Sequence, residues 1–312
     1  MSPDVAASVR ARLLAQAHDT GEEFERTLVR FAAERWLYRL GASGARNRCV
    51  LKGASLLAVW LPNPHRSTRD IDLLTSGDVD DTAIRALIAE VCAIPCPEDG
   101  IIFDLSELSL EPIRAEEEYA GVRALFWAGL GAARIRMQVD IAFGDAITSE
   151  PEEIEYPLSL PRLPAARVRA YPRVTTVAEK FEAMVKLEIR NSRMKDFHDV
   201  CALAAAFTFD GAALRAAVVA CFDRRGTPWT AERPAALTPA FYQHADLQKR
   251  WQAYLRSGGI LVAPPGRFEE VGELISRFLA PVRDSILASD GFDQTWTSQG
   301  GWTLRADRGT PA

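Results

Sequence analysis

Three acidic side chains, in two separate stretches of the chain, have the types and spacing that could hold a divalent cation. Asp70 and Asp72 are separated by Ile71, and residues two apart in a β-strand point to the same face. Two neighbouring carboxylates repel each other unless a cation lies between them. Hard oxygen ligands suit Mg²⁺, which commonly also binds the phosphates of its substrate. An isolated Asp-x-Asp is more often the polar end of a strand, so this pair needs a third ligand.

Asp140 supplies that third carboxylate. Residues 133–143 show the cleanest alternation in the sequence, which predicts a half-buried strand with one polar face. Its two faces are Ile135, Met137, Val139 and Ile141 on the apolar side, and Arg134, Arg136, Gln138 and Asp140 on the polar side. If this strand pairs beside residues 70–72, three carboxylates converge and can hold two metal ions. Such a site positions a hydroxyl nucleophile in line with a leaving pyrophosphate.

A glycine-containing loop precedes the acidic pair. The segment 52–55, Lys-Gly-Ala-Ser, joins a short apolar strand to a short helix and offers backbone and hydroxyl donors from Gly53 and Ser55. Donors of this kind predict a phosphate-binding loop. It is not a Walker loop, because the lysine comes before the glycine and a second glycine is missing. Arg66 and Arg69 flank the carboxylates and could either contact phosphate or neutralise the acidic pair.

The surrounding pattern predicts a mixed α/β fold followed by helices. We expect an α/β domain over residues 1–165, a helical domain over 166–290 and a flexible tail over 291–312. Hydrophobic periodicity and breaker residues predict helices at 21–40, 55–61, 196–207, 212–222, 247–255 and 268–287, and strands at 49–51, 68–74, 101–105, 121–128 and 133–143. Thr176 and Glu179 have the spacing of a capping box that opens a further helix. The proline-rich stretch 151–172 is typical of a linker.

Composition narrows the class of protein. The chain has 312 residues, 48% hydrophobic, with a net charge of −5, which argues against a nucleic-acid binder that uses its whole surface. Residues 162–195 nevertheless hold nine basic and three acidic side chains, and this basic window could bind polyphosphate or RNA, or be a solvated helix face. Five scattered cysteines, the lack of a signal peptide and the lack of a membrane-spanning run indicate a cytoplasmic protein with no membrane partner.

The motifs in order resemble a known family. Gly53-Ala54-Ser55, then 66–72 (Arg-Ser-Thr-Arg-Asp-Ile-Asp), then Asp140 look like the nucleotidyltransferase fold of the DNA polymerase β type. Four segments in family order resemble the AbiEii/AbiGii-type nucleotidyltransferase toxins, which include the MenT-like mycobacterial toxins. They are residues 50–57, 66–73, 179–181 (Glu-Lys-Phe) and 193–199 (Arg-Met-Lys-Asp-Phe-His-Asp). The resemblance covers residues 20 to 290. One departure is Ala54, where the family commonly has a second glycine or a serine.

This resemblance implies a toxin of a type IV-like toxin–antitoxin or phage-defence system with a cognate antitoxin. It implies Mg²⁺, a nucleoside triphosphate (CTP or GTP) as substrate, and transfer of the nucleoside monophosphate to an RNA acceptor, the 3′ end of tRNA. Asp70, Asp72 and Asp140 would be the metal ligands. Lys180 would hold the triphosphate, with Asp196 or Asp199 completing the site from the helical half. Thr68 corresponds to a hydroxyl that an antitoxin kinase phosphorylates, and a dianion there would repel both metal and nucleotide.

Other interpretations remain open at this level. Lys180 taken alone is an ordinary surface lysine of an amphipathic helix, and Asp196 could be an acidic residue favoured by the dipole of a helix start. The same chemistry could act on a protein hydroxyl or on a small molecule such as an aminoglycoside. A catalytically silent nucleotide-binding module is the alternative from another class, although such a module gains nothing from three carboxylates that repel one another.

Overall fold

The computed structural model describes residues 4–61, 66, 68–75, 80–113, 121–143, 150–257 and 260–304. The chain divides into two compact units, which are described separately. The first comprises Met1–Asp145 and Pro151–Tyr171, and the second comprises Ala146–Glu150 and Pro172–Ala312. The mixed α/β prediction is confirmed.

The first unit is built on a seven-stranded mixed sheet. Its elements are α1 (Val5–Thr20), α2 (Phe24–Ala42), β1 (Cys49–Lys52), α3 (Leu57–Trp60), β2 (Ile71–Thr75), α4 (Asp81–Cys92), β3 (Ile101–Ile113), β4 (Gly121–Leu130), β5 (Ala133–Phe143), β6 (Glu152–Glu155) and β7 (Arg167–Ala170), with short 3₁₀ turns at Gly44–Asn47 and Gly53–Leu56. The strand order is β3-β4-β5-β2-β1-β7-β6. Strands β2 and β5 are parallel, as are β1 and β7, and the other neighbours are antiparallel.

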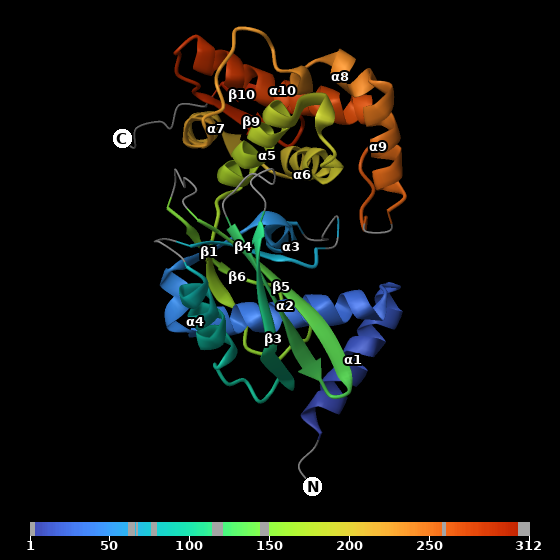
Figure 1. The fold of residues 1–312 in the computed structure, drawn as a ribbon. Helices are drawn as coiled ribbons and strands as arrows, with labels where there is room; N and C mark the ends of the chain where they lie inside the picture. Colours follow the sequence, from blue (N-terminus) through green and yellow to red (C-terminus); the bar gives the residue numbers. More distant parts are fainter. Residues whose placement is uncertain are drawn as a thin grey trace, which may run out of the picture. The chain divides into compact units, whose positions relative to one another are not determined.

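Strand β5 has the two faces that its sequence predicts. Ile135, Met137, Val139 and Ile141 are all buried, whereas Arg134 and Arg136 are exposed. Helix α2 crosses the sheet in contact with β5 and β7 (Figure 1). Its buried residues, among them Phe31, Trp36 and Leu37, form much of the core on that side. The apolar face of β5 is thereby covered, and the opposite face is left for polar side chains.

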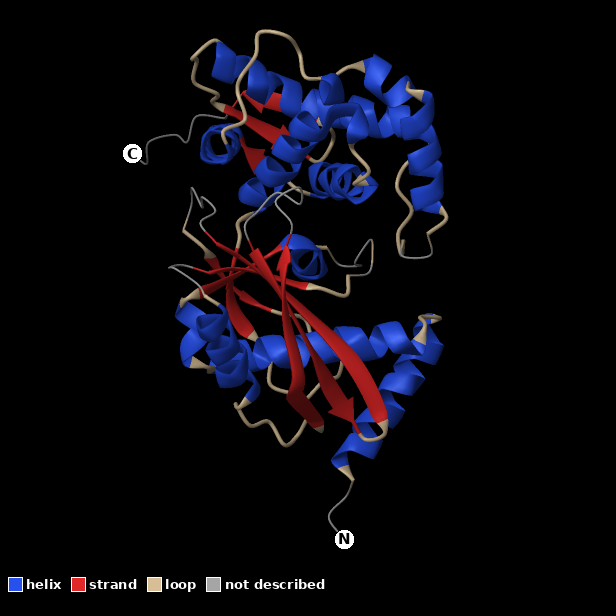
Figure 2. Cartoon of the chain, in the orientation of Figure 1, coloured by secondary structure: helices blue, strands red, loops and turns tan. Residues whose placement is uncertain are grey.

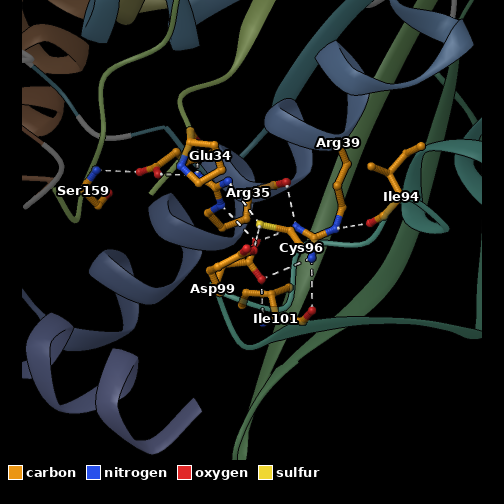
Figure 3. Close-up of polar contacts among 10 residues, drawn as sticks. Glu34, Arg35, Arg39, Ile94, Cys96, Asp99, Ile101 and Ser159 are labelled. Carbon is orange, nitrogen blue, oxygen red and sulfur yellow. Dashed lines mark hydrogen bonds and ion pairs between the residues drawn. The ribbon is translucent and has the colours of Figure 1, made fainter. Parts of the chain in front are cut away.

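Charged side chains of α2 fix the loops around the sheet (Figure 3). Arg35 and Arg39 both donate to the carboxylate of Asp99, at 3.0 and 2.7 Å, and all three side chains are almost fully buried. The carboxylate of Glu34 accepts from the backbone N–H of Ser159 at 2.6 Å. Burial raises the pKa of Glu34, although that hydrogen bond and Arg35 oppose the rise. Removing one partner from such a network is costly, so these contacts stabilise the packing of α2 against the loops.

The segment 151–172, expected as a linker, belongs to the sheet. Strand β7 lies beside β1 with Leu51 opposite Ala170, and β6 pairs with β7 at the sheet edge. The linker prediction was wrong because proline-rich composition marks only the turns of this segment. The strand contacts that order it come from residues about 120 positions earlier in the chain.

The second unit is mainly helical. Its elements are α5 (Arg173–Leu187), α6 (Met194–Ala206), β8 (Phe209–Asp210), α7 (Gly211–Arg225), α8 (Pro239–Gln243), α9 (Ala245–Leu255), α10 (Phe268–Leu287), β9 (Gln294–Thr297) and β10 (Gly301–Leu304), with 3₁₀ turns at Glu188–Arg190 and Ala235–Leu237. Phe268 lies at the centre of an aromatic core, with ring centroids of Phe197, Tyr242 and Trp251 at 4.8–5.2 Å. Helix α5 begins at Arg173, after Pro172, and not at the capping box expected from Thr176 and Glu179.

A small three-stranded sheet, β8-β9-β10, accompanies these helices (Figure 2). The expectation of a flexible tail over 291–312 therefore does not describe residues 294–304. Trp296 is fully buried, and its indole N–H donates to the carbonyl of Ala204 at 2.7 Å. This buried tryptophan anchors the segment. Residues 305–312 lie outside the described part of the chain.

Candidate active site

A ladder of charged residues crosses the polar face of the first unit's sheet. Lys52 of β1 is the register partner of Asp72 of β2, which is the partner of Asp140 of β5, which in turn faces Arg123 of β4. Register partners in neighbouring strands point to the same face and are about 5 Å apart. Two carboxylates therefore stand side by side with a cation at either end. This ladder brings Asp72 and Asp140 together, as the sequence predicts.

Asp140 is neutralised by a bidentate ion pair. The guanidinium of Arg123 donates to its two carboxylate oxygens at 2.9 and 2.8 Å, and the side-chain amide of Gln138 approaches the same carboxylate at 3.2 Å. The carboxylate is 14% exposed and the guanidinium 33%. Bidentate arginine–carboxylate pairs are strong and directional. Arg123 thus supplies the positive charge that two adjacent carboxylates require.

Asp72 is positioned by Gly53. This glycine has φ +72°, in the left-handed region, and a Cβ added there would come within 2.0 Å of the Asp72 Oδ2. Only glycine tolerates both the dihedral angle and the close approach. The Asp72 carboxylate therefore packs directly against the loop 53–55. Gly53, predicted as a phosphate-loop residue, also leaves the space that this carboxylate occupies.

Asp70 lies just outside the ladder. Strand β2 begins at Ile71, later than the expected start at residue 68. The hydroxyl of Ser55 donates to the backbone carbonyl of Asp70 at 3.1 Å, and that of Thr68 approaches the same carbonyl at 3.5 Å. The backbone of Asp70 is thus tied to the loop. Its side chain lines a groove of the same unit, together with Arg69 and Arg123.

The donor set fits a divalent cation. Asp72 and Asp140 offer hard oxygens on adjacent strands, and a guanidinium now balances part of their charge. Within the described ranges no three acidic, histidine or cysteine side chains are close enough to hold a metal ion as they stand. Asp72 and Asp140 are accordingly the core of the candidate metal site. The Asp-x-Asp spacing also predicts the Asp70 side chain as a ligand of this metal site, and that role stays a prediction.

Phosphate binding by Gly53, Ser55, Arg66 and Thr68 stays a prediction. Ser55 is 3% exposed and its hydroxyl is used by the Asp70 carbonyl. Arg66 and Thr68 are half-buried. Gly53 and Ser55 together hold the acidic pair in place, whatever further contact they make with a substrate.

Lys180, Asp196 and Asp199 come together inside the second unit. The Lys180 ammonium on α5 is 2.7 Å from a carboxylate oxygen of Asp196 and 2.8 Å from one of Asp199, both on α6 and both fully buried. Arg193 forms an ion pair with the other oxygen of Asp196 at 2.7 Å. Lys180 is therefore no ordinary surface lysine, because its side chain is only 11% exposed.

Asp196 lies in the first turn of α6, which begins at Met194, so its charge is favoured by the helix dipole as the sequence indicates. The same carboxylate also makes the ion pairs with Lys180 and Arg193. Burial alone would raise the pKa of Asp196, and the negative charge of Asp199 would raise it further. The positive charges of Lys180 and Arg193 outweigh both effects and hold the pKa of Asp196 below its ordinary value. Asp196 is thus a buried anion stabilised by two cations. The resemblance-based roles of Lys180, Asp196 and Asp199 in substrate binding remain predictions.

The basic window of residues 162–195 does not form one run of unpaired charge. Three of its members belong to the first unit and six to the second. Arg167 pairs with Glu155, Arg169 donates to the carbonyl of Asn47, and Lys180 is used as described. Much of the positive charge in this window is therefore committed to contacts within the protein.

Sequence reasoning missed the two cations that flank the carboxylates. Lys52 was noted only as a loop residue and Arg123 was not singled out. Strand register alone places both beside the acids. The available signal was the charged alternation of residues 134–140, which marks a polar face and calls for compensating charge on the neighbouring strand.

We expect Gly53→Ala to disable the site. The new Cβ would displace the Asp72 carboxylate, and a misplacement of about 1 Å can cost about 10²-fold in rate. The left-handed dihedral angle should cost a further ~1–2 kcal/mol of stability. Nucleotidyl transfer and thermal unfolding would both be measured.

Gly21→Ala is the matched control. Gly21 has φ +68°, but an added Cβ there has nothing within 4 Å. It should share the loss of stability and keep full activity. Equal activity in the two variants would contradict the role assigned to Gly53.

A mixed sheet with paired carboxylates beside a glycine loop fits the nucleotidyltransferase fold that the sequence motifs predict. Comparison with protein families agrees: the family model "Nucleotidyl transferase AbiEii toxin, Type IV TA system" matches residues 35–275. The chain belongs to this family of toxin–antitoxin nucleotidyltransferases. No curated protein matches it.

Two solved structures are similar. One is a proposed nucleotidyltransferase from H. pylori, at 15% identity and TM-score 0.49, covering 83% of this chain and 94% of that one. The other is JHP933 from Helicobacter pylori, at 15% identity and TM-score 0.47, covering 82% and 93%. In the described part of the chain no helix is long and apolar enough to cross a membrane.

Proposed function

We propose that this protein transfers a nucleoside monophosphate from a nucleoside triphosphate to the 3′ end of an RNA, with tRNA as the acceptor and Mg²⁺ as the metal. The observation that supports this most is the ladder in which Asp72 and Asp140 stand side by side between Lys52 and Arg123. The two acids do not alternate with the two bases along the ladder. They are neighbours on adjacent strands, so their carboxylate oxygens lie close together at one point of the sheet, which suits a divalent cation.

The reaction requires no nucleophile from the protein itself. A terminal hydroxyl oxygen attacks the α-phosphorus of the triphosphate, the bond from that phosphorus to the bridging oxygen breaks, and pyrophosphate leaves. Asp72 and Asp140, with Asp70, would hold Mg²⁺, which neutralises charge on the phosphates when bound. In this proposal the hydroxyl proton would pass to a carboxylate of the pair, Asp72 or Asp140, which share one face of the sheet. Positioning and charge stabilisation account for most of the expected rate gain.

Membership of a type IV toxin family implies a cognate antitoxin. We propose the cytoplasm as the place of action, where RNA and nucleoside triphosphates are available. CTP or GTP is the proposed nucleotide, and the MenT-like toxins are the proposed model for the reaction. A phosphate added to Thr68 would bring a dianion next to Asp70 and Asp72 and should switch the enzyme off.

A labelling experiment tests the proposal. The protein is incubated with Mg²⁺, total tRNA and each α-labelled nucleoside triphosphate in turn, and the products are separated on a denaturing gel. Label in RNA is the expected result. Label in protein or in a small molecule would move the acceptor to a different class of hydroxyl. No label in any fraction would favour a silent nucleotide-binding module and refute the proposed activity.

A further inference from the structure

A groove in the first unit runs from the carboxylates along β5. Its volume is about 380 Å³. The lining comes from the start of α2, the segment before β2, and strands β3, β4 and β5: Glu25, Leu28, Val29, Arg69, Asp70, Glu111, Arg123, Leu125, Arg134, Ile135, Arg136 and Gln138. One end is therefore at Asp70 and Arg123, beside the candidate metal site, and the other is at Arg134.

The groove follows an open strand edge. Strand β5 pairs with β4 along its length, but β2 joins its other side only from Val139 onward. Among the described residues no strand pairs with that second edge over residues 133–138. Arg69 and Asp70 lie where β2 would otherwise continue. The distance from residue 134 to residue 140 is roughly 20 Å, since a strand rises about 3.3 Å per residue.

Four arginines and three carboxylates (Glu25, Asp70 and Glu111) line this groove. Two of the arginines, Arg69 and Arg136, are exposed and make no ion pair or hydrogen bond within the described part of the chain, so their charge is available to a ligand. Arg134 is held in place by Glu107 at 2.8 Å and lies over the ring of Trp127 at 4.0 Å. Guanidinium groups suit phosphate because they donate in a planar fork.

We propose that this groove binds the phosphodiester backbone of the acceptor RNA and leads its 3′ end to Asp70, Asp72 and Asp140. The inference rests on the proposed function and adds where the acceptor lies. Arg136 and Arg69 contact phosphates of the RNA. Arg123 lies where the 3′ end of the RNA reaches the carboxylates. The proposed occupant is a single strand, because the groove runs along one unpaired strand edge of β5 and ends at the carboxylates where a 3′ end must arrive.

A peptide strand that pairs with the open edge of β5 is the competing occupant. A peptide strand would need only the backbone N–H and C=O groups of β5, since strand addition uses main-chain hydrogen bonds. Four arginines on the groove, with two of them unpaired, favour phosphate instead. The carboxylates at one end also match the place where a 3′ hydroxyl must arrive.

The first test measures RNA binding without catalysis. A fluorescent single-stranded RNA corresponding to a tRNA 3′ end is titrated with full-length protein, without metal or nucleotide, and anisotropy is recorded over a range of salt concentrations. The double variant Arg69→Gln/Arg136→Gln should weaken binding about tenfold, and each lost phosphate contact should reduce the salt slope by about 0.7. The control is Arg167→Gln, an exposed arginine of β7 in the basic window that is paired with Glu155, and this variant should bind like wild type.

The outcomes separate the groove from the activity. Unchanged binding in the double variant, or an equal loss in Arg167→Gln, would overturn the groove assignment. Failure of the wild type to bind RNA would overturn it too and favour the peptide. The second measurement is labelling of tRNA. If wild type labels no RNA but the double variant loses RNA binding, the groove stands and the proposed activity falls; if wild type labels RNA and the double variant labels it equally well, the groove alone falls.

Discussion

Asp72→Asn is expected to lower nucleotidyl transfer by about 10³-fold or more. The substitution keeps the shape of the side chain and removes one of the two adjacent charges that would bind the cation. Metal ions contribute several kcal/mol of charge stabilisation to such reactions, and each 1.4 kcal/mol is tenfold in rate. Initial rates of label transfer from a nucleoside triphosphate to RNA would be compared with wild type.

The same variant should remain folded. Asp72 is the register partner both of Asp140, whose repulsion the substitution removes, and of the buried Lys52, whose neighbouring charge it removes. The two effects oppose each other, so the melting temperature without metal should change little. Asp104→Asn, an exposed strand aspartate on β3, is the matched control and should keep full activity. Near wild-type transfer by Asp72→Asn would refute the assignment of this carboxylate as a metal ligand.

Lys180→Met should destabilise the second unit by ~3–5 kcal/mol. Breaking a buried ion pair by removing one partner leaves uncompensated charge, and here two buried carboxylates, Asp196 and Asp199, share the same ammonium. Chemical denaturation would measure the change. Lys186→Met, on the exposed side of the same helix, should stay within about 0.5 kcal/mol of wild type.

The pH dependence of this cluster has a definite sign. The pKa of Asp196 is lowered in the folded state, so its ionised form stabilises the fold above the ordinary carboxyl range, about pH 4, and this stabilisation is lost as the pH falls through the lowered pKa. In Lys180→Met the acid-induced loss should be smaller. The double variant Lys180→Met/Asp199→Asn should recover part of the stability. Equal stability of Lys180→Met and wild type would show that these ion pairs contribute nothing.

The parts of the fold that follow from local patterning could be predicted from the sequence. The alternation of residues 133–143 gave β5 and its two faces. Periodicity gave α2, α7, α9 and α10 to within a few residues. Strand β5 and helices α9 and α10 have clear hydrophobic spacing of their own, so the sequence carries the needed signal for them.

Elements that depend on distant partners could not be predicted. Strands β6 and β7 were expected as a linker, because β7 is ordered by pairing with β1 and not by its own composition. Strand β8 has only two residues, too short to show a period, and β9 and β10 are held by the buried Trp296. In each case a contact far along the chain decided the local structure.

The candidate site divides in the same way. Asp72 and Asp140 were predictable, because both lie on polar faces of strands and carry the right chemistry. Lys52 and Arg123 were not, since their place beside the acids depends on strand register. Asp70 was expected on the same strand face as Asp72, yet regular pairing begins one residue after it. The open edge of β5 likewise follows from where β2 begins.

Uptake of Mn²⁺, followed by electron paramagnetic resonance in the presence of a nucleoside triphosphate, tests the paired carboxylates most directly. Wild-type protein should bind the ion, and Asp72→Asn and Asp140→Asn should each weaken binding by at least about tenfold while remaining folded. Arg123→Gln should keep the site and bind the ion at least as tightly, because the competing guanidinium is gone. Equal Mn²⁺ affinity in wild type, Asp72→Asn and Asp140→Asn would contradict a metal site on this ladder.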